Sequence, residues 1–109
     1  VCIDNDEVII ETLKQGKSPI YEPELEETLK KSLKNGKIKF TLDYNSGIKN
    51  ADVIFLAAGT PPLADGSSNL NYITAASKNL AQFLSKDSLI IIKSTVPMGE
   101  QTKKLKKLF

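Results

Sequence analysis

Three polar positions in this sequence are the best candidates for chemistry. Asp4, Thr60 and Thr95 each follow closely after an apolar segment that is typical of a β-strand. In parallel α/β sheets, ligands bind beyond the carboxyl ends of the strands. The sequence therefore predicts that these three residues contribute to a ligand site.

Asp4 stands between an expected strand and an expected helix. In dinucleotide-binding folds, an acidic residue at this position accepts hydrogen bonds from the hydroxyls of the adenosine ribose. Its charge also repels a 2′-phosphate, which favours NAD over NADP. An aspartate before a helix can instead be a simple N-cap, and spacing alone leaves both interpretations open.

Thr60 and Thr95 bring small hydroxyls and backbone N–H groups to two strand ends. Such groups suit contact with a ribose, a phosphate or a nicotinamide amide. The alternative is a pair of structural turns. Cys2, within the first expected strand, is predicted to be a small core residue and not a nucleophile.

The elements that must position these residues alternate along the chain. Strands are predicted at 1–3, 38–41, 52–58 and 88–92, and helices at about 5–15, 23–36, 44–49, 71–85 and 98–109. The first helix is expected to be capped by Asn5 or Asp6, to end at Gly16, and to bury Val8, Ile9, Thr12 and Leu13. The pair Asp65-Gly66 predicts a turn. The runs 52–58 and 88–92 are apolar throughout, as in strands that are covered on both faces. This pattern predicts an α/β fold, a Rossmann-like parallel sheet with helices on both faces.

A glycine-rich turn is missing from this pattern. None of the six glycines forms a G-x-G-x-x-G sequence, which binds the pyrophosphate after the first strand of a dinucleotide-binding fold. That turn would lie before Val1. We therefore expect residues 1–109 to be part of a larger domain, incomplete at the N-terminus; a trimmed chain that is complete in itself is the alternative.

Composition excludes several classes of function. The net charge is +2, every basic residue is lysine, and the chain has one cysteine and no histidine. Without arginine, dedicated nucleic-acid binding is disfavoured, and the run 103–107 is expected to be the solvated face of a helix. A structural zinc site and a Ser-His-Asp triad lack their residues. No apolar run approaches the roughly 20 residues of a membrane span, so we expect a cytoplasmic protein without a membrane partner.

Several strings occur in an order that resembles one known family. They are V-C-I-D-N-D at 1–6, P-I-Y-E-P-E-L at 19–25, N-A-D-V-I-F at 50–55, G-T-P-P at 59–62, D-G at 65–66 and K-S-T-V-P at 93–97. Over nearly its whole length the chain is similar to the NAD-binding domain of the UDP-glucose/GDP-mannose dehydrogenase family.

The resemblance implies NAD as the cofactor and a nucleotide sugar as the substrate. The reaction would be a four-electron oxidation of the sugar C6 alcohol to a carboxylate, with two NAD reduced. The strings are most similar to the branch that converts UDP-glucose to UDP-glucuronate. The branches for UDP-N-acetylmannosamine and GDP-mannose are alternatives, as are a non-catalytic nucleotide-binding module and a lysine-rich module that recruits nucleic acid. Family members are usually dimers or larger, so a homo-oligomer is expected for the full-length protein.

The resemblance also assigns roles to residues. It makes Asp4 the ribose-binding aspartate, Thr60 a cofactor contact, and Thr95 the cofactor-binding and catalytic threonine near the nicotinamide and the catalytic water. The family's catalytic Cys, Lys and Asp belong to a later domain without a counterpart here, so this chain alone is expected to be inactive. Two positions depart from the family: Ile9 replaces a frequent lysine, and Glu24 replaces a usual glycine, which we expect the first turn of a helix to tolerate.

Overall fold

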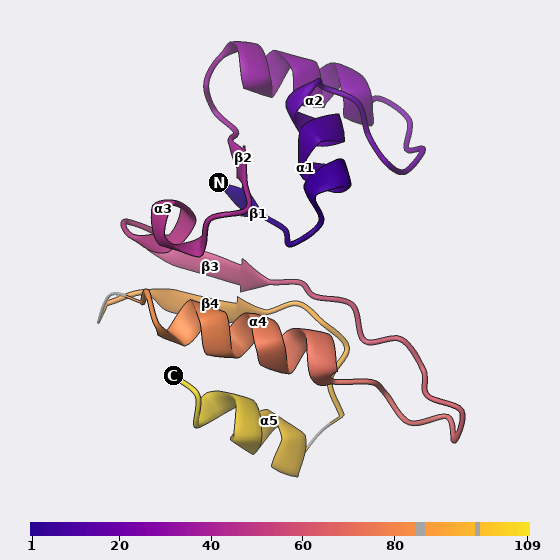
Figure 1. The fold of residues 1–109 in the computed structure, drawn as a ribbon, viewed down its shortest axis with the longest axis vertical. Coiled ribbons are helices and arrows are strands. Elements are labelled where there is room, and N and C mark those ends of the chain that lie inside the picture. The colour runs from indigo at the N-terminus through magenta and orange to yellow at the C-terminus, as the bar shows by residue number, and fades with distance from the viewer. Residues whose placement is uncertain (85–86, 98) are drawn as a thin grey trace. The chain divides into compact units, whose positions relative to one another are not determined.

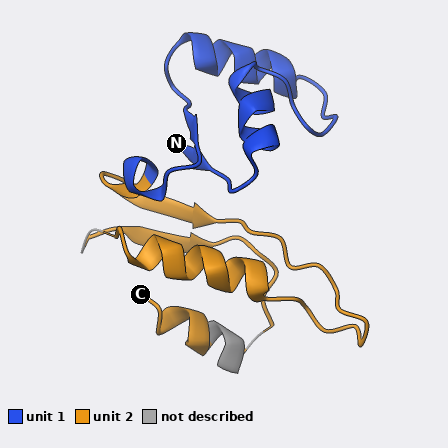
Figure 2. Ribbon diagram, in the orientation of Figure 1, with its two compact units in different colours: residues 1–47 blue, residues 48–109 orange. Residues whose placement is uncertain are grey.

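The computed structural model describes residues 1–84, 87–97 and 99–109, with the side chains of 100–102 left out. Strands and helices alternate along the chain, except that two helices follow the first strand in succession (Figure 1). The elements are β1 (Cys2–Ile3), α1 (Glu7–Lys14), α2 (Leu25–Lys34), β2 (Phe40–Thr41), α3 (Tyr44–Ile48), β3 (Val53–Leu56), α4 (Asn71–Ala81), β4 (Leu89–Ile92) and α5 (Glu100–Lys106). The chain divides into unit 1, Val1–Gly47, and unit 2, Ile48–Phe109 (Figure 2). In each unit two strands pair in parallel, β1 with β2 and β3 with β4.

Helix α1 of unit 1 has the limits that its capping residues predict. The Asp6 carboxylate accepts hydrogen bonds from the backbone N–H groups of Val8 at 2.9 Å and Ile9 at 3.2 Å. These bonds satisfy two donors of the first turn that have no partner inside the helix. After the helix, Gly16 takes a φ of 73°, the left-handed conformation that ends many helices.

The core of unit 1 joins both helices to β2. Ile10, Leu29 and Phe40 are buried together, and Leu13, Leu33 and Ile38 pack against them. The expected inward face of α1 was wrong at Val8, which is 75% exposed, while Ile10 is fully buried. Three consecutive positions of α1, 8–10, are apolar, and packing against α2 and β2 decides which of them turns inward. Cys2 is exposed, so the expectation that it fills the core was also wrong.

Helix α2 begins two residues later than Pro23 suggests. Its N-cap is Glu24, which has a φ of 64° and no side-chain capping bond. A residue with a Cβ loses roughly 1–2 kcal/mol in this left-handed region. The expectation that Glu24 is harmless in the first turn was wrong, because Glu24 lies in the turn before the helix, where a glycine avoids the clash.

Unit 2 contains the longer strands, whose pairs run from Val53↔Leu89 to Leu56↔Ile92. Its core cluster of Leu56, Ile73 and Leu105 joins β3 to α4 and α5. Because side chains alternate along a strand, both helices cover one face of this sheet.

The other face of this sheet is exposed: Val53 is 48%, Phe55 63% and Leu89 58% accessible. Among the described residues, helices cover one face of this sheet and leave the other exposed. The expectation of strands covered on both faces therefore holds for one face only. The predicted α/β fold class, with parallel strands joined through helices, is confirmed.

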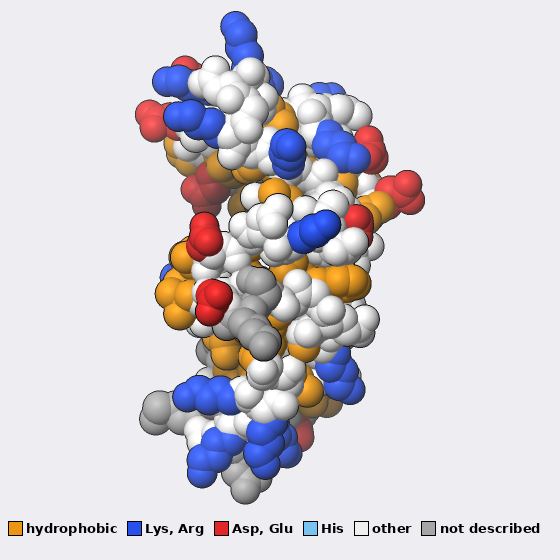
Figure 3. All heavy atoms as spheres, turned by 90° about the vertical axis from the view of Figure 1, so that its left-hand side faces the viewer, with side chains coloured by type: hydrophobic (Ala, Val, Ile, Leu, Met, Phe, Trp, Pro, Cys, Tyr) orange, Lys and Arg blue, Asp and Glu red, His pale blue; other side chains and the backbone are white. Residues whose placement is uncertain are grey.

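Helix α5 carries the most basic segment of the chain. Lys103, Lys104, Lys106 and Lys107 are exposed, whereas Leu105 between them is buried. Figure 3 shows lysine side chains gathered over this end of unit 2. The pattern is the solvated face of an amphipathic helix, as the sequence predicts. Within the described part of the chain, no helix combines the length and apolar character required to cross a bilayer.

Candidate functional site

The loops after β3 and β4 leave the sheet side by side. The two strands are parallel and their last pair is Leu56↔Ile92. One further backbone bond, from Lys93 N–H to the Leu56 carbonyl at 2.8 Å, continues the pairing past the strand ends. Because of this pairing, G-T-P-P and K-S-T-V-P start from neighbouring points at the carboxyl end of the sheet.

Two hydroxyl groups tie these loops together. Thr60 Oγ1 donates to the carbonyl of Thr95 at 2.9 Å, and Ser94 Oγ donates to the carbonyl of Ala58 at 2.7 Å. The structure therefore brings Thr60 and Thr95 together across 35 positions of sequence. Our sequence analysis missed Ser94, because its partner is a backbone carbonyl of the other loop; its place inside K-S-T-V-P was the available indication.

Thr95 has an exposed side chain on an anchored backbone. Its carbonyl is held by Thr60, and the next residue, Val96, packs against the core of unit 2. Pro97 lacks an N–H and restricts the backbone of Val96. The Thr95 hydroxyl can donate one hydrogen bond and accept others, so the arrangement presents one polar group to a ligand from a fixed position.

The segment between Thr60 and α4 folds into a narrow turn. The N–H of Leu63 donates to the Ser67 carbonyl at 2.7 Å, and Gly66 has a φ of 81°. The Asp65 carboxylate accepts from the Ser67 hydroxyl at 2.6 Å and from the Ser67 N–H at 2.9 Å. These bonds stabilise the charged form and lower the pKa of Asp65. The predicted Asp65-Gly66 turn is confirmed.

Asp4, the candidate in unit 1, directly follows β1 and is half-buried. Its N–H donates to the Thr41 carbonyl at 3.3 Å, and its Oδ1 accepts from the Asp6 N–H at 3.0 Å. Asp6, and not Asp4, caps α1. The Oδ2 atom of Asp4 has no hydrogen-bond partner among the described residues, so it can accept a bond from a ligand hydroxyl.

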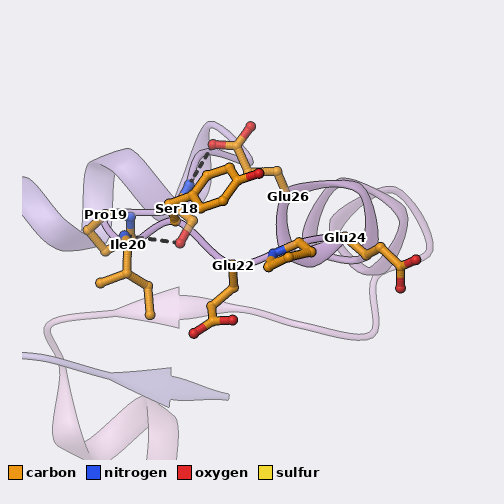
Figure 4. Close-up of a pocket in the computed structure, with 8 residues that line it drawn as sticks. Ser18, Pro19, Ile20, Glu22, Glu24 and Glu26 are labelled. Atoms are coloured by element: carbon orange, nitrogen blue, oxygen red, sulfur yellow. Dashed lines mark hydrogen bonds between the residues drawn. The ribbon is translucent and has the colours of Figure 1, made fainter.

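An open cavity of about 400 Å³ lies elsewhere in unit 1, along the segment that precedes α2 (Figure 4). Ser18 N–H donates to Glu26 Oε1 at 3.1 Å, and Ile20 N–H donates to Ser18 Oγ at 3.2 Å. None of Asp4, Thr60 and Thr95 lines this cavity. Among the residues that the structure describes, no group of three or more His, Cys, Asp or Glu side chains could hold a metal ion.

These features define a class of protein. Parallel strands joined through helices, with polar groups at the strand exits, are the architecture of Rossmann-type nucleotide-binding domains. Over 97% of this chain, a UDP-glucose dehydrogenase from Pyrobaculum islandicum has a TM-score of 0.87 and 34% identity, and the match covers 25% of that protein. A ternary complex of GDP-mannose dehydrogenase from Pseudomonas aeruginosa has a TM-score of 0.90 and 28% identity over 97% of this chain and 25% of its own.

Sequence comparison indicates the same class of protein. The UDP-glucose 6-dehydrogenase YwqF of Bacillus subtilis is 44% identical over 98 residues, which are 90% of this chain and 22% of that protein. The model of the UDP-glucose/GDP-mannose dehydrogenase family, NAD binding domain, matches residues 1–109. The chain belongs to this family, and it spans about a fifth of the length of the curated relatives it matches.

NAD is the cofactor that the family implies, and the residues present fit part of it. The unpartnered Oδ2 of Asp4 suits a ribose hydroxyl, and the loops after β3 and β4 present the Thr95 hydroxyl at a strand exit. The pyrophosphate is usually bound by a glycine-rich turn, and this sequence contains no G-x-G-x-x-G.

Proposed function

We propose that the full-length protein is an NAD-dependent dehydrogenase that oxidises UDP-glucose to UDP-glucuronate at C6. One observation carries the proposal: the Thr60–Thr95 hydrogen bond joins the G-T-P-P and K-S-T-V-P loops at the carboxyl end of the unit 2 sheet. Curated relatives at 44% and 46% identity are UDP-glucose 6-dehydrogenases. A GDP-mannose dehydrogenase has a closely similar fold at only 28% identity. Sequence therefore favours UDP-glucose, and UDP-N-acetylmannosamine and GDP-mannose are the alternative substrates.

Each candidate residue has a role in this proposal. NAD, when bound, would supply the hydride acceptor for oxidation of the sugar carbon. Asp4 accepts hydrogen bonds from the adenosine ribose hydroxyls and disfavours a 2′-phosphate. Thr60 belongs to the cofactor-contacting loop. Thr95 acts in catalysis, where its hydroxyl holds the nicotinamide amide and a reacting water, because it can donate one hydrogen bond while it accepts another.

Other parts of the enzyme are proposed to lie outside this sequence. Residues 1–109 form part of the NAD-binding domain, and the pyrophosphate turn belongs to another part of the same polypeptide. The thiol nucleophile and the sugar-binding residues belong to further domains. The short share of each relative that this chain spans supports this division. We further propose a cytoplasmic homo-oligomer that has neither a nucleic-acid nor a membrane partner.

The test is NADH formation by the purified full-length protein with each of the three nucleotide sugars. We expect the highest kcat/KM with UDP-glucose, and two NADH for each UDP-glucuronate formed. One NADH per sugar would contradict the four-electron reaction, and a preference for another sugar would select an alternative. The 109-residue chain alone is expected to form no NADH; activity there would place the chemistry on residues that we regard as structural.

A further inference from the structure

The strand exits of unit 2 are joined in a reciprocal way. Each loop gives a side-chain hydroxyl to a backbone carbonyl of the other loop: Ser94 donates to Ala58 at 2.7 Å, and Thr60 donates to Thr95 at 2.9 Å. The Leu56 carbonyl lies farther from Ser94 Oγ, at 3.4 Å. A hydroxyl has a single proton, so the shorter contact to Ala58 is the principal hydrogen bond. We call the Ser94–Ala58 and Thr60–Thr95 bonds the exit clamp.

The exit clamp leaves both of its hydroxyls with reduced capacity for a ligand. The protons of Thr60 and Ser94 are committed to carbonyls of the protein, so each oxygen can only accept from a bound molecule. Ser94 is also half-buried. Thr95 differs, because its hydroxyl is on an exposed side chain and only its backbone carbonyl is used by the clamp.

We propose that Thr60 and Ser94 are positioning residues, which hold the backbone of Thr95 so that its hydroxyl stays in the geometry that the reaction needs. This inference rests on the proposed function, and it assigns to Thr60 a role different from direct cofactor contact. Small displacements of a group near the reacting atoms reduce rates strongly. The clamp therefore affects kcat more than it affects the affinity for NAD.

The same sheet contains a matched control. At the opposite ends of the two strands, Ser88 Oγ donates to the Ala51 carbonyl at 2.8 Å across 37 positions of sequence. This bond joins β4 to β3 by the same chemistry as the clamp, but at the amino ends of the strands. Removal of the Ser88 hydroxyl therefore removes a cross-strand bond of the same kind without touching the strand exits.

The kinetic test uses the full-length protein with Thr60→Val, Thr60→Ser, Ser94→Ala and Ser88→Ala. We expect Thr60→Val and Ser94→Ala each to lower kcat about threefold to tenfold, the effect of one hydrogen bond, with the Kd for NAD changed less than about twofold. Thr60→Ser keeps the hydroxyl and should restore kcat. Ser88→Ala should lower the Tm and leave kcat unchanged.

A double-mutant cycle shows whether Thr60 acts through Thr95. In a Thr95→Val background, Thr60→Val should have almost no further effect on kcat, because the hydroxyl that it positions is already absent. Independent, multiplicative losses would overturn the proposal. A loss of NAD affinity as large as the loss of kcat would also overturn it, because Thr60 would then be a direct contact.

Hydrogen exchange tests the clamp without any reaction. In the protein without NAD, Thr60→Val should speed amide exchange at Lys93, whose N–H donates to the Leu56 carbonyl beside the clamp, about fivefold or more, because local opening there costs less free energy. Exchange within α4 should stay unchanged. Unchanged exchange at Lys93 would overturn the clamp even in an active enzyme. Faster exchange in a protein that oxidises no nucleotide sugar would retain the clamp as a structural device and reject the proposed function.

Discussion

The two units hold their candidate residues in different ways. In unit 1, the Asp4 carboxylate is oriented by the N–H of Asp6, two positions away. In unit 2, Thr95 is held by a hydroxyl that is 35 positions away in the sequence, and Ser94 by a carbonyl 36 positions away. The orientation of the Asp4 carboxylate therefore depends on one turn of chain, although the Asp4 backbone N–H donates to the distant Thr41 carbonyl, whereas the arrangement around Thr95 depends on the pairing of β3 with β4. Substitution of Asp4 should act on the ligand contact itself, while substitutions of Thr60 and Ser94 should act through the geometry of Thr95.

The largest effect is expected for Thr95→Val in the full-length protein. Valine keeps the shape of threonine and removes the hydroxyl, so kcat should fall about tenfold to a hundredfold, equivalent to one or two hydrogen bonds at the transition state. The Tm should hardly change because the side chain is exposed. Steady-state kinetics and a melting curve on the same preparation measure both. A sharp fall in Tm with normal kcat would make Thr95 a structural turn residue.

Asp4→Ala should mainly affect cofactor binding. Loss of a charge-assisted hydrogen bond costs roughly 1.5–3 kcal/mol, which is about tenfold to a hundredfold in NAD affinity. The affinity for NADP should fall much less, because the repulsion between Asp4 and the 2′-phosphate disappears at the same time. Asp6→Ala is the matched control: it removes the α1 cap and should cost about 0.5–2 kcal/mol of stability with little effect on NAD. Equal losses for both cofactors in Asp4→Ala would contradict ribose recognition.

Glycine substitutions compare the packing of the two units. A Cβ at Gly47 would lie 2.6 Å from Ile3 Cδ1, while one at Gly59 would meet nothing within 4 Å. Overpacking costs about 1–3 kcal/mol of stability. The higher helix propensity of alanine offsets part of this cost, so Gly47→Ala should lower the free energy of unfolding by about 1 kcal/mol. Ile3→Val should recover only part of that loss in the double variant, because it removes Cδ1 but keeps Cγ1, which lies 2.7 Å from the added Cβ. Gly59→Ala should leave the free energy of unfolding unchanged or raise it slightly, as measured by denaturant unfolding.

A smaller gain in stability is expected from Glu24→Gly. Glycine avoids the strain of the left-handed backbone at φ 64°, which should raise the free energy of unfolding by roughly 1–2 kcal/mol. The greater freedom of glycine in the unfolded chain lowers the free energy of unfolding by about 0.5–1 kcal/mol. The net result is about 0.5–1 kcal/mol of stabilisation. Glu22→Gly, at a position without positive φ, should destabilise. If both variants destabilise, the backbone at Glu24 is not strained in solution.

The smallest effect concerns pH. Asp43 in unit 1 and Asp65 in unit 2 both have a pKa below the ordinary 3.8, chiefly because of hydrogen bonds donated by Ser46 and Ser67. A lowered folded-state pKa contributes stability above the unfolded value, and this contribution is lost as the pH falls through the folded value. Ser67→Ala should raise the pKa of Asp65 and leave that of Asp43 unchanged, as followed by NMR titration. An unchanged Asp65 would show that the Ser67 hydroxyl does not bond to it in solution.

Features with local causes were predicted well from the sequence. The Asp6 cap, the glycine after α1 and the Asp65-Gly66 turn each depend on residues within four positions of one another. The parallel α/β fold followed from apolar strands that alternate with amphipathic helices. Asp4, Thr60 and Thr95 were selected because they stand at strand exits, a property of the linear order of elements.

Tertiary structure decided the features whose partners are distant in sequence. Ile10 replaces Val8 in the core of unit 1 because Leu29 and Phe40 choose the inward face of α1. Ser77 of α4 is fully buried, and its hydroxyl has no partner among the described residues, which periodicity did not indicate. The exit clamp needs Ser94 and Thr60 to meet backbone carbonyls. Every residue has a carbonyl, so no residue type in the sequence marks such a partner, and only the register of β3 on β4 brings the atoms together.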